Sequence, residues 1–157
     1  MPPKPPVVVP KPVPPPEPAK PEITGVRGFV AGMPAGLKAG LPDAYWVYFD
    51  DQGWHLRTTT DNPAVRKFGG QIFLAEGAMA DVRAYRVEAQ DRLKKTSAQL
   101  IDFGFETIGE MDGVDFKFTG SKCVQFKLLI DGKPKPTQIW LGANKVHPPG
   151  SDFAICL

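Results

Sequence analysis

The sequence has little of what most catalytic and metal-binding proteins require. It contains two histidines, two cysteines and 157 residues in all, whereas a zinc site usually takes three or four His, Cys or carboxylate ligands at recognisable spacing. Neither His55 nor His147 has such a partner, and no oxyanion-loop signature accompanies a Cys-His pair. We therefore expect no metal, no cofactor and no catalytic residues, and we predict that the protein is not an enzyme.

An excess of one charge and long apolar runs are also missing. The 19 basic and 17 acidic residues give a net charge of +2, so no basic field points to nucleic acid. No stretch approaches the roughly 20 apolar residues of a membrane-spanning helix. We expect a protein or a glycan as the partner, with neither nucleic acid binding nor a membrane span.

Proline is abundant at one end of the chain. Eleven of the 18 prolines lie in residues 1–22, and proline both fixes φ and removes a backbone donor, which favours a polyproline II segment over a helix or a sheet. We predict a disordered proline-rich stalk over residues 1–22 and one β-sandwich domain over residues 23–157. The roughly 135 residues of the second part are enough to bury a core.

Two functions are open for this stalk. Pro15, Pro18 and Lys20 form a Pro-x-x-Pro-x-Lys pattern of the kind that SH3-like grooves bind, which would make the protein a cytoplasmic adaptor. We favour a spacer, because such patterns arise by chance in runs of Pro and Lys. Met1 leads directly into Pro2-Pro3-Lys4, without a secretory pattern. We expect a cell-envelope or extracellular protein whose leader or anchor precedes these residues, with the cytoplasm as the alternative.

The rest of the chain alternates apolar and polar residues as β-strands do. Two β-rich runs, 44–50 and 54–60, flank an Asp/Gly turn and form the strongest hairpin signal. Further alternating runs predict strands over 101–106, 114–119, 124–130, 139–141 and 153–157. About eight or nine short strands without long amphipathic helices predict an all-β fold, a single antiparallel sandwich or barrel-like sandwich.

Three intervening segments have weaker signals. Residues 31–43 are rich in Gly, Ala and Pro and predict an irregular loop. Asp61-Asn62-Pro63 predicts a single helical turn through Arg66. Gly69-Gly70 predicts a break before a strand over residues 71–75.

The two cysteines share a strand face. If Val124 and Phe126 face the core, Cys123 points the other way, and the same parity holds for Cys156 beside Ile155. A cross-strand disulfide and two unrelated half-buried thiols are both consistent with this pattern.

Aspartates gather at the expected turns: Asp50, Asp51, Asp112, Asp115 and Asp131. Aspartate favours turns because its side chain accepts bonds from nearby backbone N–H groups. A calcium site needs about six converging oxygens, and no Asp-x-Asp-x-Asp-Gly run is present. A hydrolase with paired carboxylates is the least favoured alternative, and a pocket holding two or more of Asp50, Asp51, Asp112 and Asp115 would support it.

Aromatic residues provide the best candidate for a binding surface. Trp140 is out of phase with its apolar neighbours and should project from the opposite strand face, with Gln138. One alternating set of the run 45–49 must also face away from the core, which makes Trp46 or Tyr48 a second candidate. An exposed Trp can stack on a sugar or anchor a protein partner, unless the loop 31–43 or 145–150 covers it. By the same parity we expect His55, with Arg57 and Thr59, on a solvated strand face.

These patterns together predict a non-catalytic binding or structural module that a proline-rich stalk displays in a cell-envelope or extracellular assembly.

Overall fold

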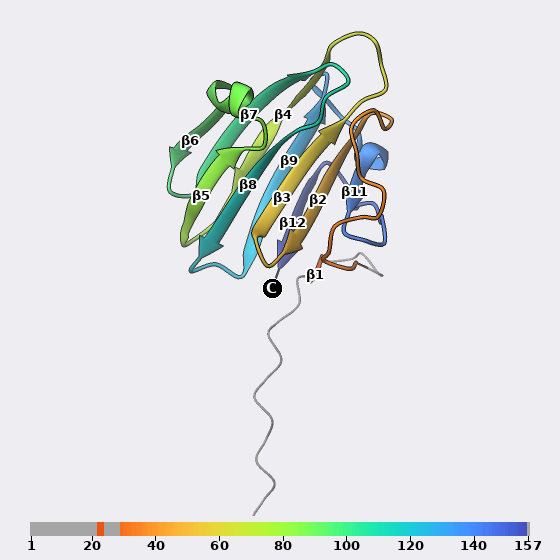
Figure 1. Ribbon diagram of the computed structural model, residues 1–157. Helices are drawn as coiled ribbons and strands as arrows, with labels where there is room; N and C mark the ends of the chain where they lie inside the picture. Colours follow the sequence, from red (N-terminus) through yellow and green to blue (C-terminus); the bar gives the residue numbers. More distant parts are fainter. Residues whose placement is uncertain (1–21, 24–28, 157) are drawn as a thin grey trace, which may run out of the picture.

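The computed structural model describes residues 22–23 and 29–156, with the side chains of 29–156, and shows two β-sheets packed face to face (Figure 1). The large sheet has the strand order β1-β12-β9-β4-β7-β6, with β10 paired to β9, and the small sheet has the order β11-β2-β3-β8-β5. Residues 1–21, with Pro15, Pro18 and Lys20, lie outside the described part. The division predicted at residue 22 therefore stays a prediction.

The strand bounds follow the alternating runs of the sequence closely. The large sheet consists of β1 (Glu22–Ile23), β4 (Arg66–Phe73), β6 (Leu93–Ser97), β7 (Leu100–Thr107), β9 (Cys123–Ile130), β10 (Lys133–Pro134) and β12 (Asp152–Cys156). The small sheet consists of β2 (Ala44–Asp50), β3 (Gly53–Thr59), β5 (Ala78–Ala84), β8 (Asp112–Thr119) and β11 (Ile139–Leu141). Two short 3₁₀ helices, η1 (Val87–Arg92) and η2 (Pro136–Gln138), lie between strands. Neither of these described helices is long and apolar enough to span a membrane.

The predicted all-β sandwich is confirmed, with two differences in detail. The described residues form twelve strands rather than eight or nine, because β1 and β10 have only two residues, too few to show alternation, and β6 is a mostly polar run. Among the described strands all pairings are antiparallel except one: β11 runs parallel to β2, with Trp140 beside Trp46. The parallel direction is possible because β11 is reached from β10 of the large sheet through η2, and no tight hairpin joins it to β2 to impose the antiparallel direction.

The hairpin predicted from residues 44–60 is formed by β2 and β3. Its turn depends on Gly53, whose φ is +117°, a value that L side chains rarely adopt. Asp50 Oδ1 accepts a hydrogen bond from the Gln52 backbone N–H at 2.9 Å, as expected of aspartate in a turn.

Two predictions for residues 61–75 are wrong, the helical turn and the break at Gly69-Gly70, whereas the predicted strand over 71–75 corresponds to the end of β4. Residues 61–65 form no helical turn; instead Asn62 Oδ1 accepts the Ala64 N–H at 2.8 Å. Strand β4 then runs without a break through Gly69 and Gly70, between β7 and β9. A Cβ atom on Gly70 would lie 2.0 Å from the backbone oxygen of Lys127. The glycine marks the close approach of a neighbouring strand rather than the end of one.

The inner faces of the two sheets form the core. The alternation that predicts Val114 and Phe116 on one face, opposite Asp115, agrees with the burial of β8, and the same holds for Phe126 and exposed Lys127 in β9. The largest fully buried side chains are Tyr45, Phe68, Phe105, Phe116, Phe126, Leu56, Ile72, Ile101, Leu128, Ile139, Leu141 and Ile155. They come from both sheets, so the core is one layer between them.

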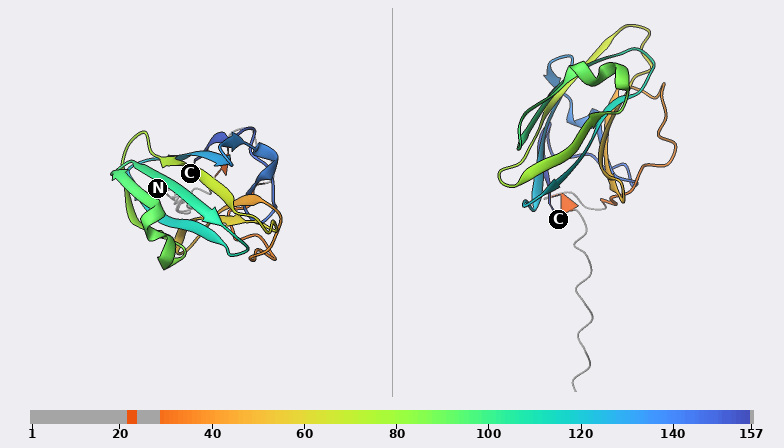
Figure 2. Two further views of the ribbon diagram at one scale, coloured as in Figure 1. Left: turned by 90° about the horizontal axis from the view of Figure 1, so that it is seen from above. Right: turned by 60° about the vertical axis from the view of Figure 1, so that its left-hand side comes forward.

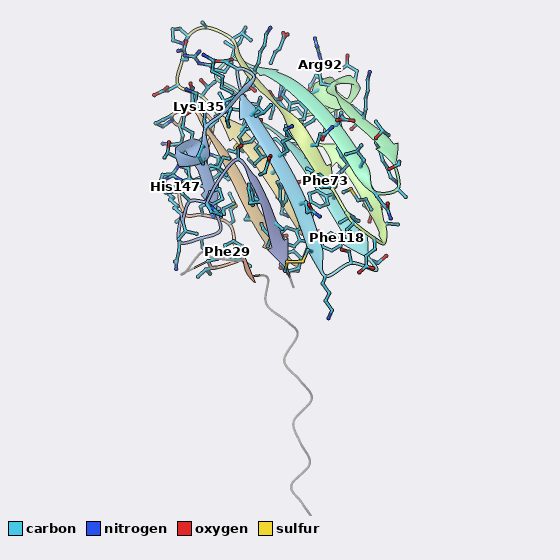
Figure 3. The ribbon with its side chains drawn as sticks, turned by 180° about the vertical axis from the view of Figure 1, so that it is seen from behind. Phe29, Phe73, Arg92, Phe118, Lys135 and His147 are labelled. Carbon is cyan, nitrogen blue, oxygen red and sulfur yellow. A yellow bond between two sulfur atoms is a disulfide. The ribbon has the colours of Figure 1, made fainter. Side chains whose placement is uncertain are left out.

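A disulfide joins Cys123 and Cys156, one of the two arrangements that the sequence leaves open. The two residues are directly opposed on β9 and β12, and Figure 3 shows the bond in yellow at the ends of these strands. Closing a loop of this size restricts the unfolded chain and stabilises the fold by about 3 to 4 kcal/mol in chain-entropy terms.

Candidate functional site

The outer face of the small sheet is covered, not solvated. Trp46 and Tyr48 on β2 are each only 5% exposed, and they form a second apolar cluster with Leu37 and Ala44. The loop of residues 31–43 lies over this face; the right-hand view of Figure 2 shows it on the outer side of the small sheet. The prediction that Trp46 or Tyr48 belongs to an exposed platform is therefore wrong, because the loop folds over both.

Backbone hydrogen bonds hold the covering segments in place. The Phe49 N–H donates to the Ala31 carbonyl at 2.7 Å, and the Ala143 N–H donates to the Val30 carbonyl at 2.8 Å. The Gly142 N–H donates to the Val47 carbonyl at 2.8 Å. The start of the loop is thus fixed both to β2 and to the turn that follows β11.

Trp140 lies on the strand face opposite Ile139 and Leu141, as alternation predicts, but it is half buried. Its ring stacks on Trp46 with centroids 6.0 Å apart and planes 19° apart. The ring of His147 lies 3.8 Å from it, centroid to centroid, and His147 Nδ1 is 2.7 Å from the Ile139 carbonyl oxygen. His147, labelled in Figure 3, thereby covers part of the indole.

A pocket of about 410 Å³ opens between the loop and β11. Its lining, which we call the tryptophan pocket, is Leu41, Pro42, Asp43, Ala44, Trp46, Thr137, Gln138, Trp140 and Lys145. Trp140, Gln138 and Trp46 are thus brought together, whereas Tyr48 is absent from the lining.

Three polar groups stand out in this pocket. The Lys145 ammonium lies 5.5 Å from the centre of the Trp46 ring. The side-chain oxygen of Gln138 is buried and has no hydrogen-bond partner among the described residues, which costs about 1 to 3 kcal/mol in a folded protein. Asp43 pairs with Arg66 Nε at 2.9 Å, so its charge is already compensated.

Four residues of the lining carry no signal in the sequence that marks them as site residues: Leu41, Pro42, Thr137 and Lys145. Each lies in a segment without periodicity. They converge on Trp46 only because the loop 31–43 and the chain around β11 pack against the same strand.

A cluster of charged side chains surrounds His55 on the outer face of the small sheet. This residue is 8% exposed, with Nδ1 2.5 Å from Asp115 Oδ1 and Nε2 2.7 Å from Asp50 Oδ1. Arg57 pairs with Asp115 at 2.8 Å, and its guanidinium lies 4.0 Å from the centre of the Tyr85 ring. The prediction of a solvated His55 is wrong, because the ring of Tyr48 lies 4.8 Å from the imidazole, centroid to centroid, and Asp50 and Asp115 enclose it.

This cluster forms ion pairs and leaves no imidazole nitrogen free. Burial opposes protonation of His55, but hydrogen bonds to Asp115 and Asp50 outweigh it, and the pKa of His55 is raised. Burial likewise opposes ionisation of Asp115, but the bond from His55 and the charge of Arg57 outweigh it, and the pKa of Asp115 is lowered. Both shifts favour an imidazolium held between two carboxylates.

The other aspartates lie apart from Asp50 and Asp115. Asp112 is fully buried and accepts hydrogen bonds from Arg86 Nε and Thr107 Oγ1, each at 2.7 Å. Asp131 accepts from Arg66 and from the Lys67 backbone, and Asp51 is exposed at the β2–β3 turn. The pocket beside Asp115, lined by Gln52, Asp81, Val82, Arg83, Asp115, Phe116 and Lys117, holds one of the four aspartates named for a hydrolase.

The stability of the protein is expected to depend on pH through His55. Because the pKa of His55 is raised in the folded protein, its stabilising contribution is fully present below about pH 6.5, the pKa of histidine in the unfolded chain. This contribution is lost as the pH rises through the higher pKa of the folded protein. The lowered pKa of Asp115 acts at the other end: its contribution is lost as the pH falls below about 4. Thermal unfolding of wild type and His55→Gln should therefore differ most near about pH 5 to 6 and converge at alkaline pH.

His147→Gln is the matched control, since His147 bonds to a carbonyl oxygen rather than to a carboxylate. It should retain the pH profile of wild type. A constant difference between wild type and His55→Gln across the range from about pH 5 to 9 would contradict the assignment.

Over the described residues, no group of three or more His, Cys, Asp or Glu side chains is placed to hold a metal ion. No family model matches the chain, and neither a curated protein nor a solved structure matches it.

Proposed function

We propose that this protein is a non-catalytic binding module that takes up an apolar group of a protein partner in the tryptophan pocket. The observation that carries the proposal is a pair of stacked indoles, Trp46 and Trp140, lining a surface pocket. Buried aromatic side chains at the centre of an interface usually contribute most of its binding energy.

The pocket wall supplies apolar area that is already ordered. Trp46 is fixed by a hydrogen bond from its Nε1 to Thr59 Oγ1 at 2.9 Å, and Trp140 is fixed between Trp46 and His147. A ligand therefore need not order these rings when it binds, which removes an entropy cost of about 0.5 to 1.5 kcal/mol for each side chain.

A protein partner is favoured over a glycan by the state of Trp140. Stacking on a sugar requires a free, flat ring face, and the His147 ring already lies 3.8 Å from this indole. A pocket between two chain segments suits an inserted side chain better than a sugar ring, which usually stacks on an open aromatic surface.

The disulfide supports a cell-envelope or extracellular location, which the proline-rich segment also suggests. Disulfides persist in oxidising compartments and are rare in the cytosol, and the Cys123–Cys156 bond joins two strands of the folded domain. With a proline-rich segment ahead of the domain, this favours display in a cell-envelope or extracellular assembly over the cytoplasmic adaptor.

Selection of displayed random peptides against the full-length protein tests the proposal. We expect enriched peptides whose affinity falls by about 2 kcal/mol, roughly 30-fold, in Trp140→Ala. Trp140 is half buried, so this variant should also lose about 1 to 2 kcal/mol of stability, and circular dichroism must show that it remains folded.

Lys127→Ala is the control, because Lys127 is exposed on the large sheet, away from the pocket. It should bind the selected peptides as wild type does. Enriched peptides that bind Trp140→Ala and wild type equally would show that the partner site lies elsewhere.

A further inference from the structure

We propose that the tryptophan pocket recognises a polyproline II segment and that residues 14–18 of this chain, Pro-Pro-Pro-Glu-Pro, supply it. This inference rests on the proposed function, since it names the ligand of the same site. It joins two features that are otherwise unconnected, the proline run of the sequence and the indole pair of the fold.

The walls of the pocket match the chemistry of proline. Aromatic-lined grooves bind proline-rich segments because the extended helix is preformed and loses little entropy on binding. Here two indoles with planes 19° apart line the pocket together with Leu41 and Pro42. A pyrrolidine ring is apolar and brings no N–H group that would need an acceptor inside the pocket.

The pocket also offers hydrogen-bond donors, which a proline-rich ligand requires because its backbone presents mainly carbonyl oxygens. The indole Nε1 of Trp46 is occupied by Thr59. Two other groups of the lining can donate to a ligand. They are the ammonium of Lys145, which is exposed at the rim, and the carboxamide of Gln138.

Charge complementarity selects residues 14–18 within the proline-rich segment. Glu17 is the single acidic residue among residues 1–21, and Lys145 lies beside Trp46 at the pocket. A polyproline II helix has three residues per turn, so Pro15 and Pro18 share one edge and Glu17 lies on the adjacent edge. If Pro15 and Pro18 contact the indoles, the Glu17 carboxylate is placed to pair with the Lys145 ammonium.

The test uses the full chain with its own segment disabled by Pro15→Ser and Pro18→Ser. A synthetic peptide of residues 10–21 is titrated into this variant while tryptophan fluorescence is recorded under acrylamide. Trp46 and Trp54 are buried, so quenching reports mainly Trp140. We expect saturable protection by the wild-type peptide and none by a peptide that carries the same two serines.

Charge reversal makes the test specific. Lys145→Glu, in the same full-length background, should weaken the wild-type peptide by about tenfold or more, and a peptide with Glu17→Lys should regain the affinity. Lys127→Glu is the matched control and should leave the affinity unchanged. Without the serine changes, Trp140 of the full chain should already be protected from acrylamide. If this protection is independent of protein concentration, the segment binds its own domain. If it rises with protein concentration, the segment binds a second copy.

The inference is overturned if the peptide causes no saturable change up to about 1 mM, or if Lys145→Glu leaves its binding unchanged. Peptide selection separates this failure from that of the proposed function. If the selected peptides depend on Trp140 but lack proline, the proposed binding function is supported and its proline-rich ligand is contradicted. If both experiments fail, both proposals are contradicted.

Discussion

Replacing Phe126 with alanine is expected to lower the free energy of unfolding by about 3 to 5 kcal/mol, the range for a buried aromatic that leaves a cavity. Phe126 is 1% exposed and lies in β9, between β4 and β12. Its ring contacts Phe153 at 5.2 Å and Phe116 of the opposite sheet at 6.4 Å, centroid to centroid. Removing the side chain would therefore remove one aromatic contact between the two sheets and one within the large sheet.

The neighbouring residue provides the control for Phe126. Lys127 is exposed on the outer face of the same strand, so Lys127→Ala should cost less than about 0.5 kcal/mol. Chemical denaturation of both variants measures the two values. Equal losses, or a larger loss for Lys127, would mean that the register of β9 is displaced by one residue.

Replacing Gly70 with alanine is expected to destabilise the protein by about 3 kcal/mol or more, at the upper end for overpacking. The added Cβ would lie 2.0 Å from the backbone oxygen of Lys127 and 3.0 Å from its carbonyl carbon. Backbone atoms of a paired strand cannot move aside as the end of a flexible side chain can. Either β4 and β9 separate at this point or their hydrogen bonds are lost.

Gly104 tests whether this effect is specific to the contact. It also lies within a strand of the large sheet, in β7, but no heavy atom beyond its chain neighbours lies within 4 Å of the position that an added Cβ would occupy. Gly104→Ala should change the free energy of unfolding by less than about 0.5 kcal/mol. A comparable loss in both variants would show that the cost does not arise from the close approach of Lys127, because the lower entropy of the unfolded chain alone would favour alanine at both positions.

The glycine pair in β4 also illustrates how sequence signals can mislead. Gly69-Gly70 resembles a break between elements, because glycine is depleted within strands. Inside β4, however, Gly70 is the residue that permits a neighbouring backbone to approach. Only the positions of β4 and β9 in space distinguish the two cases.

The candidate site is predictable from the sequence in part. Alternation places Trp140 on the face opposite Ile139 and Leu141, where it contacts Trp46. It cannot place Leu41, Pro42 or Lys145, which complete the pocket from aperiodic segments. The same limit applies to His55, because its parity identifies the strand face but not the carboxylates of Asp50 and Asp115 that enclose it.

Features that depend on residues near one another in the chain are readable from the sequence alone. Period-two alternation defines the main strands and their core-facing residues, and the Asp/Gly turn defines the β2–β3 hairpin. What covers the outer face of the small sheet depends on tertiary structure, because the loop 31–43 must fold back over β2, and His147 comes from a distant part of the chain to cover Trp140. Local patterns specify which face of a strand a side chain occupies, whereas burial on that face depends on which other segments pack against it.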